Sequence, residues 1–205
     1  MARPTQKEAR RRDLIAAAER AVQQHGVAQV KLKHIAEAAG VSPTSLLYYY
    51  DDGLDAILAD VHRGGMERFC ALRERAVAEL DSPVAQLVSM IRLGLPVGAD
   101  DHLVRMLYEM SAFLQRNRFH AMLASQFIQR QVLLYEQVFR VGQASGDFVL
   151  GEEPRVASRS MLALEDGLCL HVIIGSPTFA RPQALRAMSE FATLATGTVI
   201  DASDP

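Results

Sequence analysis

The sequence predicts an all-α protein, in which a three-helix helix-turn-helix head is followed by a C-terminal helical bundle, with about nine helices in total. Apolar residues recur at spacings of three and four along most of the chain, which is the period of an amphipathic helix. Glycine and proline clusters divide the chain into segments of helical length. No alternating apolar and polar run with hairpin turn signals occurs, so no strand is expected.

The first predicted helix covers residues 8–25. Leu14, Ala18 and Val22 recur at one-turn spacing, with arginines at several of the other positions. Gly26 follows the last residue of this pattern, and glycine readily takes the left-handed conformation that ends many helices. The sequence therefore predicts an amphipathic helix that ends just before Gly26.

Two short helices are expected next. The first covers about residues 32–38 and ends in a turn at Gly40. Ser42 can cap the second helix through its side-chain oxygen. Pro43 suits the first helical position, because no amide donor is needed there.

The segment from Leu32 to Asp51 has the features of a helix-turn-helix. Two short helices that cross steeply need a small residue at the crossing and a glycine in the turn, and Ala36 and Gly40 meet those needs. The apolar residues that would close the small core are Ile35, Ala39, Val41, Leu46 and Tyr49. An ordinary helical hairpin within a core is the alternative interpretation.

Six more helices are expected after residue 53. Asp81-Ser82-Pro83 and Gly175-Ser176-Pro177 are two of the turn signals that separate them. Gly64-Gly65 lies inside the first of the six, and each glycine costs about 1 kcal/mol relative to alanine, so we expect a kink or break there. The expected ranges are 54–80, 83–95, 101–116, 118–144, 154–174 and 180–197.

Charge is distributed unevenly between the two expected domains, residues 1–53 and 54–205. The chain has a net charge of −2, yet residues 1–50 hold eight basic and four acidic side chains, a net of +4 that leaves −6 for the rest. A basic segment beside an acidic remainder is typical of a surface for nucleic-acid phosphates. A solvated basic helix face is the alternative.

Composition sets further limits. No run approaches the roughly 18 apolar residues of a membrane helix, and no apolar secretion signal is visible, so no membrane partner is expected. Cys70 and Cys169 lie far apart without metal-ligand spacing, which favours a cytoplasmic location with reduced thiols. His102, His120 and His171 also lack such spacing. We expect no metal, cofactor or catalytic residue.

In a helix-turn-helix, the second helix lies in the major groove of double-stranded DNA with its N-terminal residues towards the base edges. Hydroxyl groups can bond phosphates or bases, and the apolar parts of Pro43 and Thr44 can meet thymine methyl groups. No Arg, Asn or Gln lies on this helix, so DNA shape is expected to contribute to specificity. The predicted DNA-binding residues are Lys31, Lys33, Ser42, Pro43, Thr44, Ser45, Leu47, Tyr48 and Tyr49. Tyr50 is assigned to the core.

This arrangement resembles the tetracycline-repressor (TetR) family of transcriptional regulators. The resemblance depends on residues 35–42, on Ser45-Leu46 and on tyrosines 48–50, with looser similarity at residues 162–168. It implies a homodimer built from the last two helices and a near-palindromic operator with half-sites about 34–36 Å apart. It also implies repression that ends when a small-molecule effector binds.

Three positions depart from the family pattern. A threonine is common where this chain has Val30-Lys31, a tyrosine at Leu47, and a phosphate-binding lysine at Gly53. Asp51-Asp52 adds negative charge near the expected DNA backbone. Phosphate contacts would then come from Lys31, Lys33 and the arginines of the first helix, where each contact adds to the salt dependence of binding.

The resemblance further implies an effector pocket inside the bundle. Such pockets combine apolar walls with a few polar groups that orient the ligand. The candidates are Met106, Tyr108, Glu109, Phe113, Phe127, Gln131, Tyr135 and Glu165. For each of them taken singly, plain core or surface is the more common role. A shift of the long helix at 54–80 would carry the signal to the head.

Two other functions stay open. An all-helical small-molecule enzyme is one, although the chain has no nucleophile elbow, phosphate-binding glycine loop, HExxH motif or carboxylate cluster. A helix-turn-helix protein without DNA binding is the other, because Leu47 and Gly53 depart from the pattern.

Overall fold

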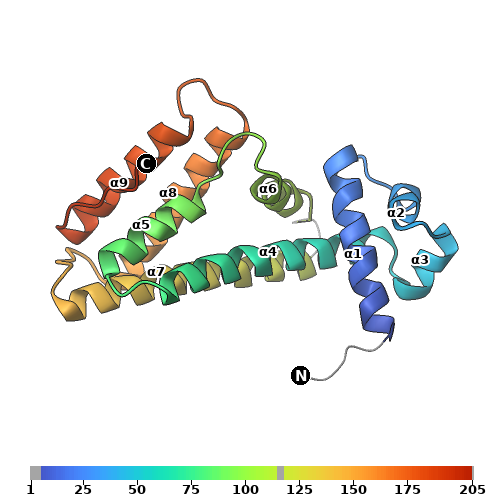
Figure 1. Cartoon of the computed structure of the whole chain (residues 1–205), viewed down its shortest axis with the longest axis horizontal. Helices are drawn as coiled ribbons and strands as arrows, with labels where there is room; N and C mark the ends of the chain where they lie inside the picture. The colour runs from blue at the N-terminus through green and yellow to red at the C-terminus, as the bar shows by residue number, and fades with distance from the viewer. Residues whose placement is uncertain (1–5, 115–117, 205) are drawn as a thin grey trace. The chain divides into compact units, whose positions relative to one another are not determined.

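This computed structural model describes residues 6–114 and 118–204, with side chains for 7–111 and 121–204. These residues contain nine α-helices and no strand. Figure 1 labels the helices. The all-α prediction with about nine helices is confirmed. The helices are α1 (Gln6–His25), α2 (Leu32–Ala39), α3 (Pro43–Tyr49), α4 (Leu54–Ala78), α5 (Pro83–Gly94), α6 (His102–Leu114), α7 (Arg118–Ser145), α8 (Pro154–Ile173) and α9 (Arg181–Thr196).

The helices form two compact units. The first comprises Met1–Met66 and Met106–Leu123, and the second comprises Glu67–Arg105 and Ala124–Pro205. The predicted head, residues 1–53, lies wholly within the first unit. Because α4 is one continuous helix that contributes residues to both units, it links them covalently without a loop.

In the first unit, α2 packs against α1 and leads into α3 (Figure 1). α1 ends at His25, and Gly26 follows with φ +74°, as predicted. Gly40 ends α2 in the left-handed conformation, with φ +64°, and its N–H donates to carbonyls of the last turn. Leu14, Ile35 and Leu46 are fully buried and form the small core of the three helices.

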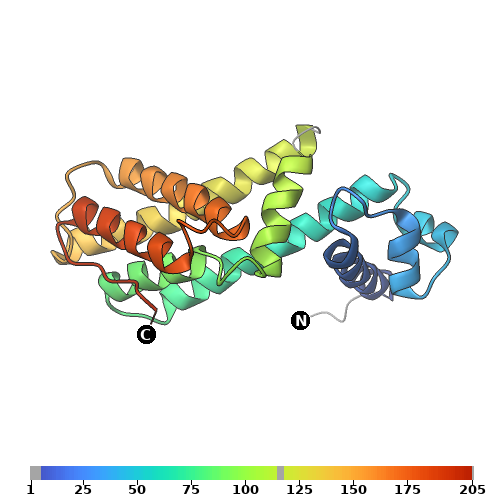
Figure 2. The same cartoon turned by 90° about the horizontal axis from the view of Figure 1, so that it is seen from above.

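In the second unit, α8 and α9 lie side by side in both views (Figures 1 and 2), and α5 packs against each of them. Ser82 caps α5 through its Oγ, which accepts the Ala85 N–H at 3.4 Å. Leu87, Ile91 and Met161 are fully buried in this core. In the described residues, no helix is both long and apolar enough to cross a bilayer.

α4 continues without a break through Gly64-Gly65, so the expected break is absent. Val61 and Met66, which flank the two glycines, are buried. Apolar burial is worth about 1.5–3 kcal/mol for each large side chain, which exceeds the local cost of a helical glycine.

Candidate functional site

α3 presents its first turn to solvent. The Ser42 Oγ accepts the Ser45 N–H at 3.1 Å, and Pro43 occupies the first helical position, as predicted. Leu46 is fully buried and fixes the inner face of the helix. Ser42, Pro43, Thr44 and Ser45 are all exposed. The first turn of α3 is therefore held on its inner side by Leu46 and is exposed to solvent on its outer side.

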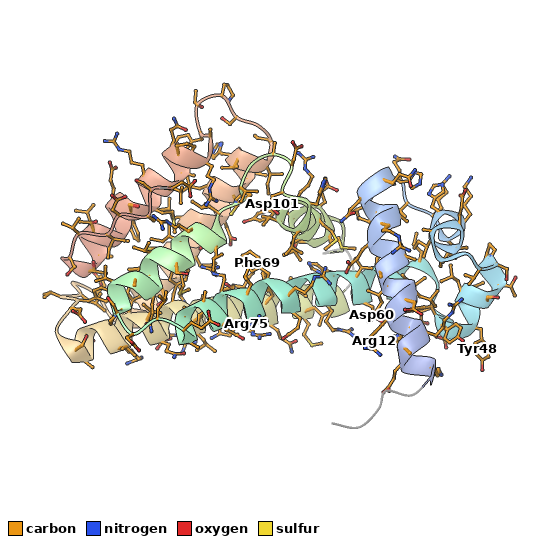
Figure 3. All side chains as sticks on the ribbon, viewed as in Figure 1. Arg12, Tyr48, Asp60, Phe69, Arg75 and Asp101 are labelled. Atoms are coloured by element: carbon orange, nitrogen blue, oxygen red, sulfur yellow. The ribbon has the colours of Figure 1, made fainter. Side chains whose placement is uncertain are left out.

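The three tyrosines at the end of α3 have three different environments. Tyr48 is 78% exposed and lies on the outer side of α3 (Figure 3), and Leu47 is 42% exposed. Tyr49 is half-buried and meets the Tyr48 ring edge-on at 5.1 Å between centroids. Tyr50 is buried, which confirms its assignment to the core.

A polar network in the first unit joins α1, the end of α3 and α4. The Tyr50 hydroxyl donates to Asp60 Oδ2 at 3.0 Å, and Arg11 donates to the same oxygen at 2.9 Å from Nε. Arg63 donates to Asp60 Oδ1 at 2.8 Å. Burial raises the pKa of Tyr50 to about 12, with the Asp60 charge acting in the same direction. The network fixes the end of α3 relative to α4.

The start of α2 is held by a histidine pair. The rings of His25 and His34 stack with centroids 4.0 Å apart. His34 Nδ1 accepts the Lys31 N–H at 3.2 Å, so one free donor at the helix N-terminus is satisfied. Desolvation lowers the pKa of His34, and His25, Lys33 and Lys31 lower it further. Lys31 and Lys33 are both exposed beside this pair.

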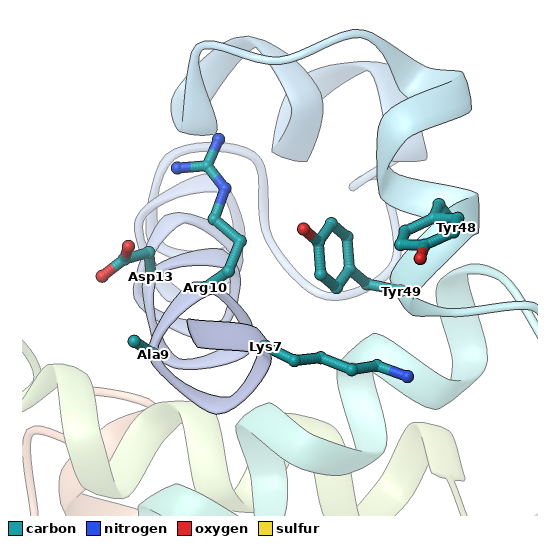
Figure 4. Close-up of a pocket in the computed structure, with 6 residues that line it drawn as sticks. All are labelled: Lys7, Ala9, Arg10, Asp13, Tyr48 and Tyr49. Atoms are coloured by element: carbon teal, nitrogen blue, oxygen red, sulfur yellow. The ribbon is translucent and has the colours of Figure 1, made fainter. Parts of the chain in front are cut away.

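Some basic side chains of α1 are bonded to other described residues, and others are not. Arg11 is paired with Asp60, and Arg20 donates to the Ala38 carbonyl at 2.9 Å. Lys7, Arg10 and Arg12 form no hydrogen bond or ion pair with another residue of the described chain. Lys7 and Arg10 line a surface hollow between α1 and α3 (Figure 4). Those three charges therefore remain available for an anionic partner.

Three of the predicted effector residues meet in the core of the second unit, around an arginine that was not predicted. Arg73 of α4 is fully buried and pairs with Glu165 of α8 through two bonds, at 2.8 and 2.9 Å. It also donates to Gln131 Oε1 at 2.6 Å and to the Met90 carbonyl at 3.1 Å. The Tyr135 hydroxyl donates to Glu165 Oε2 at 2.5 Å.

The network is charge-balanced and leaves one group without a partner. Burial acts to lower the pKa of Arg73, but Glu165, Tyr135 and the hydrogen bonds together raise it, so the arginine stays charged. Its guanidinium also lies over the rings of Phe69 and Tyr135, at 5.4 and 5.1 Å. Only Nε of Arg73 lacks a hydrogen-bond partner. Gln131, Tyr135 and Glu165 are therefore bonded within the chain.

The other predicted effector residues are not part of this network. Phe127 is half-buried and meets Phe69 edge-on at 5.8 Å. On α6, Met106 is buried, Tyr108 is half-buried and Glu109 is exposed. Phe113 falls outside the side chains that the structure describes.

Arg73 is not among the residues that the sequence pattern singled out. For Arg73 a signal exists, because Met66, Phe69, Cys70 and Val77 surround it at helical spacing and all are buried. A charge within such an apolar stripe indicates a buried ion pair.

Comparison with known proteins agrees with this architecture. The model of bacterial regulatory proteins of the tetR family matches residues 14–58, and that of the BetI-type transcriptional repressor C-terminal region matches residues 83–195. No curated protein sequence matches the chain.

Three solved structures show the same fold. A TetR transcription regulator from Haloarcula marismortui has a TM-score of 0.81 at 21% identity, over 92% of this chain and 98% of its own. A proposed transcriptional regulator from Saccharomonospora viridis, in complex with choline, has a TM-score of 0.80 at 20% identity, over 91% and 96%. SmeT, the repressor of a multidrug efflux pump of Stenotrophomonas maltophilia, has a TM-score of 0.71 at 20% identity, over 95% and 96%.

The matched family models cover both the helix-turn-helix and most of the C-terminal helices, well over half of the chain. The resemblance that the sequence motifs indicated is confirmed: the chain belongs to the TetR family of transcriptional regulators.

Proposed function

We propose that this regulator is a cytoplasmic repressor that binds a near-palindromic operator as a homodimer and releases it when a small-molecule effector binds. The observation that supports DNA binding most directly is the first turn of α3. Its hydroxyl-bearing residues are exposed on a helix whose inner side is anchored by Leu46. Lys31 and Lys33 lie exposed at the start of α2, where they would meet phosphates.

The test is fluorescence anisotropy of the purified protein on DNA from upstream of its own gene, titrated with salt and with random competitor DNA. We expect tight, competitor-resistant binding that weakens steeply with salt. Thr44→Ala and Tyr48→Ala should lose operator binding, whereas Gln129→Ala, on the exposed surface of α7, should not. Absence of any preference over random DNA, here and in a genome-wide selection of bound fragments, would contradict the proposal.

Homodimerisation is supported by an exposed stripe along α8. Residues at alternating spacings of four and three share one side of the helix. The stripe consists of Val156, Ser160, Ala163, Gly167, Leu170 and Ile174, all exposed in the single chain. Small residues in its middle allow another helix to approach closely, and apolar residues at its ends supply buried area. This is the face on which we place the second copy.

Gly167 offers a sharp test of that interface. A Cβ built there meets nothing within 4 Å, so a larger side chain fits the single chain. In a dimer packed on this face it would separate the helices. We expect Gly167→Leu to sediment as a folded monomer where the wild type is a dimer, and Gln137→Leu on α7 to remain dimeric. A dimeric Gly167→Leu protein would exclude this face.

For the effector, we propose that Gln131, Tyr135 and Glu165 are the polar groups that it engages, with Phe127 as an apolar neighbour. A solved relative holds choline, and an organic cation would compete with Arg73 for the Glu165 carboxylate and for the aromatic faces of Phe69 and Tyr135. Met106, Tyr108, Glu109 and Phe113 remain predictions from the sequence.

Release requires that the effector bind the DNA-incompetent state more tightly than the competent one. A ligand that disturbs the Arg73–Glu165 pair would shift α4, and α4 also carries Asp60, which holds Tyr50 and Arg11. Choline is the first probe: it should raise the melting temperature and weaken operator binding, with smaller effects in Tyr135→Phe. If saturating choline and a wider ligand screen leave operator affinity unchanged, the effector proposal is wrong.

A further inference from the structure

The polar network around Arg73 is closed to solvent. Arg73 and Tyr135 are fully buried, and Gln131 and Glu165 are only 1% and 3% exposed. A ligand can therefore reach these side chains only if a neighbouring helix moves aside. The helix that moves at the lowest cost is the one whose movement breaks the fewest bonds to the network.

The last turn of α5 covers the network without contributing a polar side chain to it, among the described residues. Its Met90 carbonyl accepts a hydrogen bond from Arg73 at 3.1 Å, and its Gly94 carbonyl accepts one from Cys169 Sγ at 3.3 Å. Gly94 lies directly against Glu165, because a Cβ built on it would be 2.3 Å from Oε2. The charged and amide side chains of the network all come from α4, α7 and α8.

Arg181, the first residue of α9, holds the end of α5. Its Nη1 donates to the carbonyls of Leu95 and Pro96 at 2.6 and 3.1 Å, and its Nη2 donates to that of Arg92 at 3.2 Å. Carbonyls at the end of a helix have no partner within the helix, so this guanidinium satisfies them. The same guanidinium binds the Asp204 carboxylate, at 2.8 Å from Nε and 3.1 Å from Nη2. Arg181 therefore joins α5 to the end of the chain.

Residues 197–204, which we call the C-terminal strap, run back along α9 from its last turn to its first (Figures 1 and 2). Ala202 is fully buried, and its N–H donates to Ser189 Oγ of α9 at 3.0 Å. Arg92 of α5 donates to the carbonyl of Ala202 at 3.1 Å and to that of Ser203. The strap is therefore bonded to both α9 and α5.

We propose that the C-terminal strap holds α5 closed over the Arg73 network, and that release of the strap lets α5 move away and gives a ligand access to the network. The role in ligand access rests on the proposed function, because the network is the proposed effector site. The movement of α5 itself does not depend on which ligand binds.

Movement of α5 costs less than movement of the other helices around the network. Movement of α8 would separate Glu165 from Arg73 and leave a buried charge without its partner, which is strongly unfavourable. Movement of α5 breaks one hydrogen bond of Arg73 and leaves the ion pair intact. The Arg181–Asp204 pair lies near the surface, with the Asp204 side chain 48% exposed, and such pairs contribute little. Local opening is therefore expected at the strap and α5.

The nearest alternative is that the strap stabilises the whole second unit and controls no local opening. Two buried cysteines distinguish these possibilities. Cys169 lies beneath the last turn of α5, whereas Cys70 of α4 accepts a hydrogen bond from Gln131 of α7 at 2.9 Å. Movement of α5 alone exposes Cys169, and unfolding of the unit exposes both thiols.

The experiment is alkylation of the native protein by iodoacetamide without effector, with the rate at each cysteine measured by peptide mass spectrometry. The variants are a chain that ends at Asp201, which lacks the end of the strap, and Asp204→Asn. We expect Cys169 to react about ten- to a hundred-fold faster in the shortened chain, because several hydrogen bonds that hold the closed state are lost. Asp204→Asn should give a smaller increase at Cys169, and Cys70 should keep its wild-type rate in both variants.

Glu190→Gln is the matched control. It breaks the Arg186–Glu190 ion pair, which lies on the surface of α9 and does not involve the strap, so both thiols should react at the wild-type rates. An unchanged Cys169 rate in the shortened chain, or an equal increase at both cysteines, would overturn the inference.

A stopped-flow measurement tests ligand access with choline as the probe and tyrosine fluorescence as the signal. The association rate should rise in the shortened chain, and an equal rate in both proteins would contradict the role in ligand access. If choline binds neither protein, the choline proposal fails, whereas the alkylation rates still test the movement of α5. The two failures are therefore distinguishable.

Discussion

Removing the carboxylate of Glu165 should destabilise the second unit strongly. Glu165→Gln keeps nearly the same volume but leaves Arg73, which has no exposed surface, without its counter-charge. Two of the four bonds made by Arg73 go to this carboxylate, and Tyr135 donates to it as well. Breaking a buried ion pair by removing one partner costs about 3–5 kcal/mol. We expect a loss of unfolding free energy in that range.

The assay is urea unfolding followed by circular dichroism at one fixed protein concentration, because dimerisation would couple stability to concentration. Arg186 and Glu190 on α9 supply a matched control. They form a pair at 2.8 Å but are 80% and 63% exposed, and exposed pairs contribute little. Glu190→Gln should therefore leave the midpoint close to the wild-type value.

A double-mutant cycle tests the coupling itself. Arg73→Met and Glu165→Met should each be strongly destabilising, whereas the double variant should lose about 3 kcal/mol less than their sum, because no unpaired charge remains buried. Additive losses, or a Glu165→Gln midpoint no lower than that of Glu190→Gln, would refute the reasoning.

Three further perturbations follow from the geometry. A Cβ at Gly94 would run into the Glu165 carboxylate, so Gly94→Ala should cost about 1–3 kcal/mol in urea unfolding by displacing that group. The pKa of Tyr50 is raised from 10.0 to about 12, so the folded state holds this proton more tightly. The free energy of unfolding should therefore fall by about 3 kcal/mol between pH 10 and pH 12. In a series of unfolding measurements at alkaline pH, Tyr50→Phe should not show this loss. The pKa of His34 is lowered below its ordinary 6.5. The stabilisation that the neutral imidazole gives to the folded state is therefore present above pH 6.5, and it is lost as the pH falls through the pKa of the folded state. An NMR titration of the imidazole should show this, and His34→Gln should flatten the stability profile over that range.

The head could be predicted in detail because its constraints are local. Gly40 must accept a positive φ, and Ser42-Pro43 is a capping pair whose geometry depends on neighbouring residues only. In α4, the local helix propensity of the residues is a poorer predictor of the structure. The two glycines at 64 and 65 do not interrupt α4, because burial on either side outweighs their preference against the helix.

The interior of the second unit could be predicted only in part, because burial is a tertiary property. Glu165, Tyr135 and Gln131 were recognised as polar groups of a candidate site, but their partner Arg73 was not. Arg73 lies among charged neighbours in the chain, and only its position in an apolar stripe distinguishes it from Glu74 and Arg75. Which glutamate is buried could not be decided either: Glu109 is exposed and Glu165 is buried.

The backbone explains why a lysine at position 53 would be unfavourable in this chain. Gly53 stands where the family often has a phosphate-binding lysine, and here it has φ +72°. A residue with a Cβ takes that conformation at a cost of about 1–2 kcal/mol, so a lysine at this position would strain the turn that leads into α4. That turn is also the segment between Tyr50 and Asp60, whose hydrogen bond fixes the end of α3 on α4.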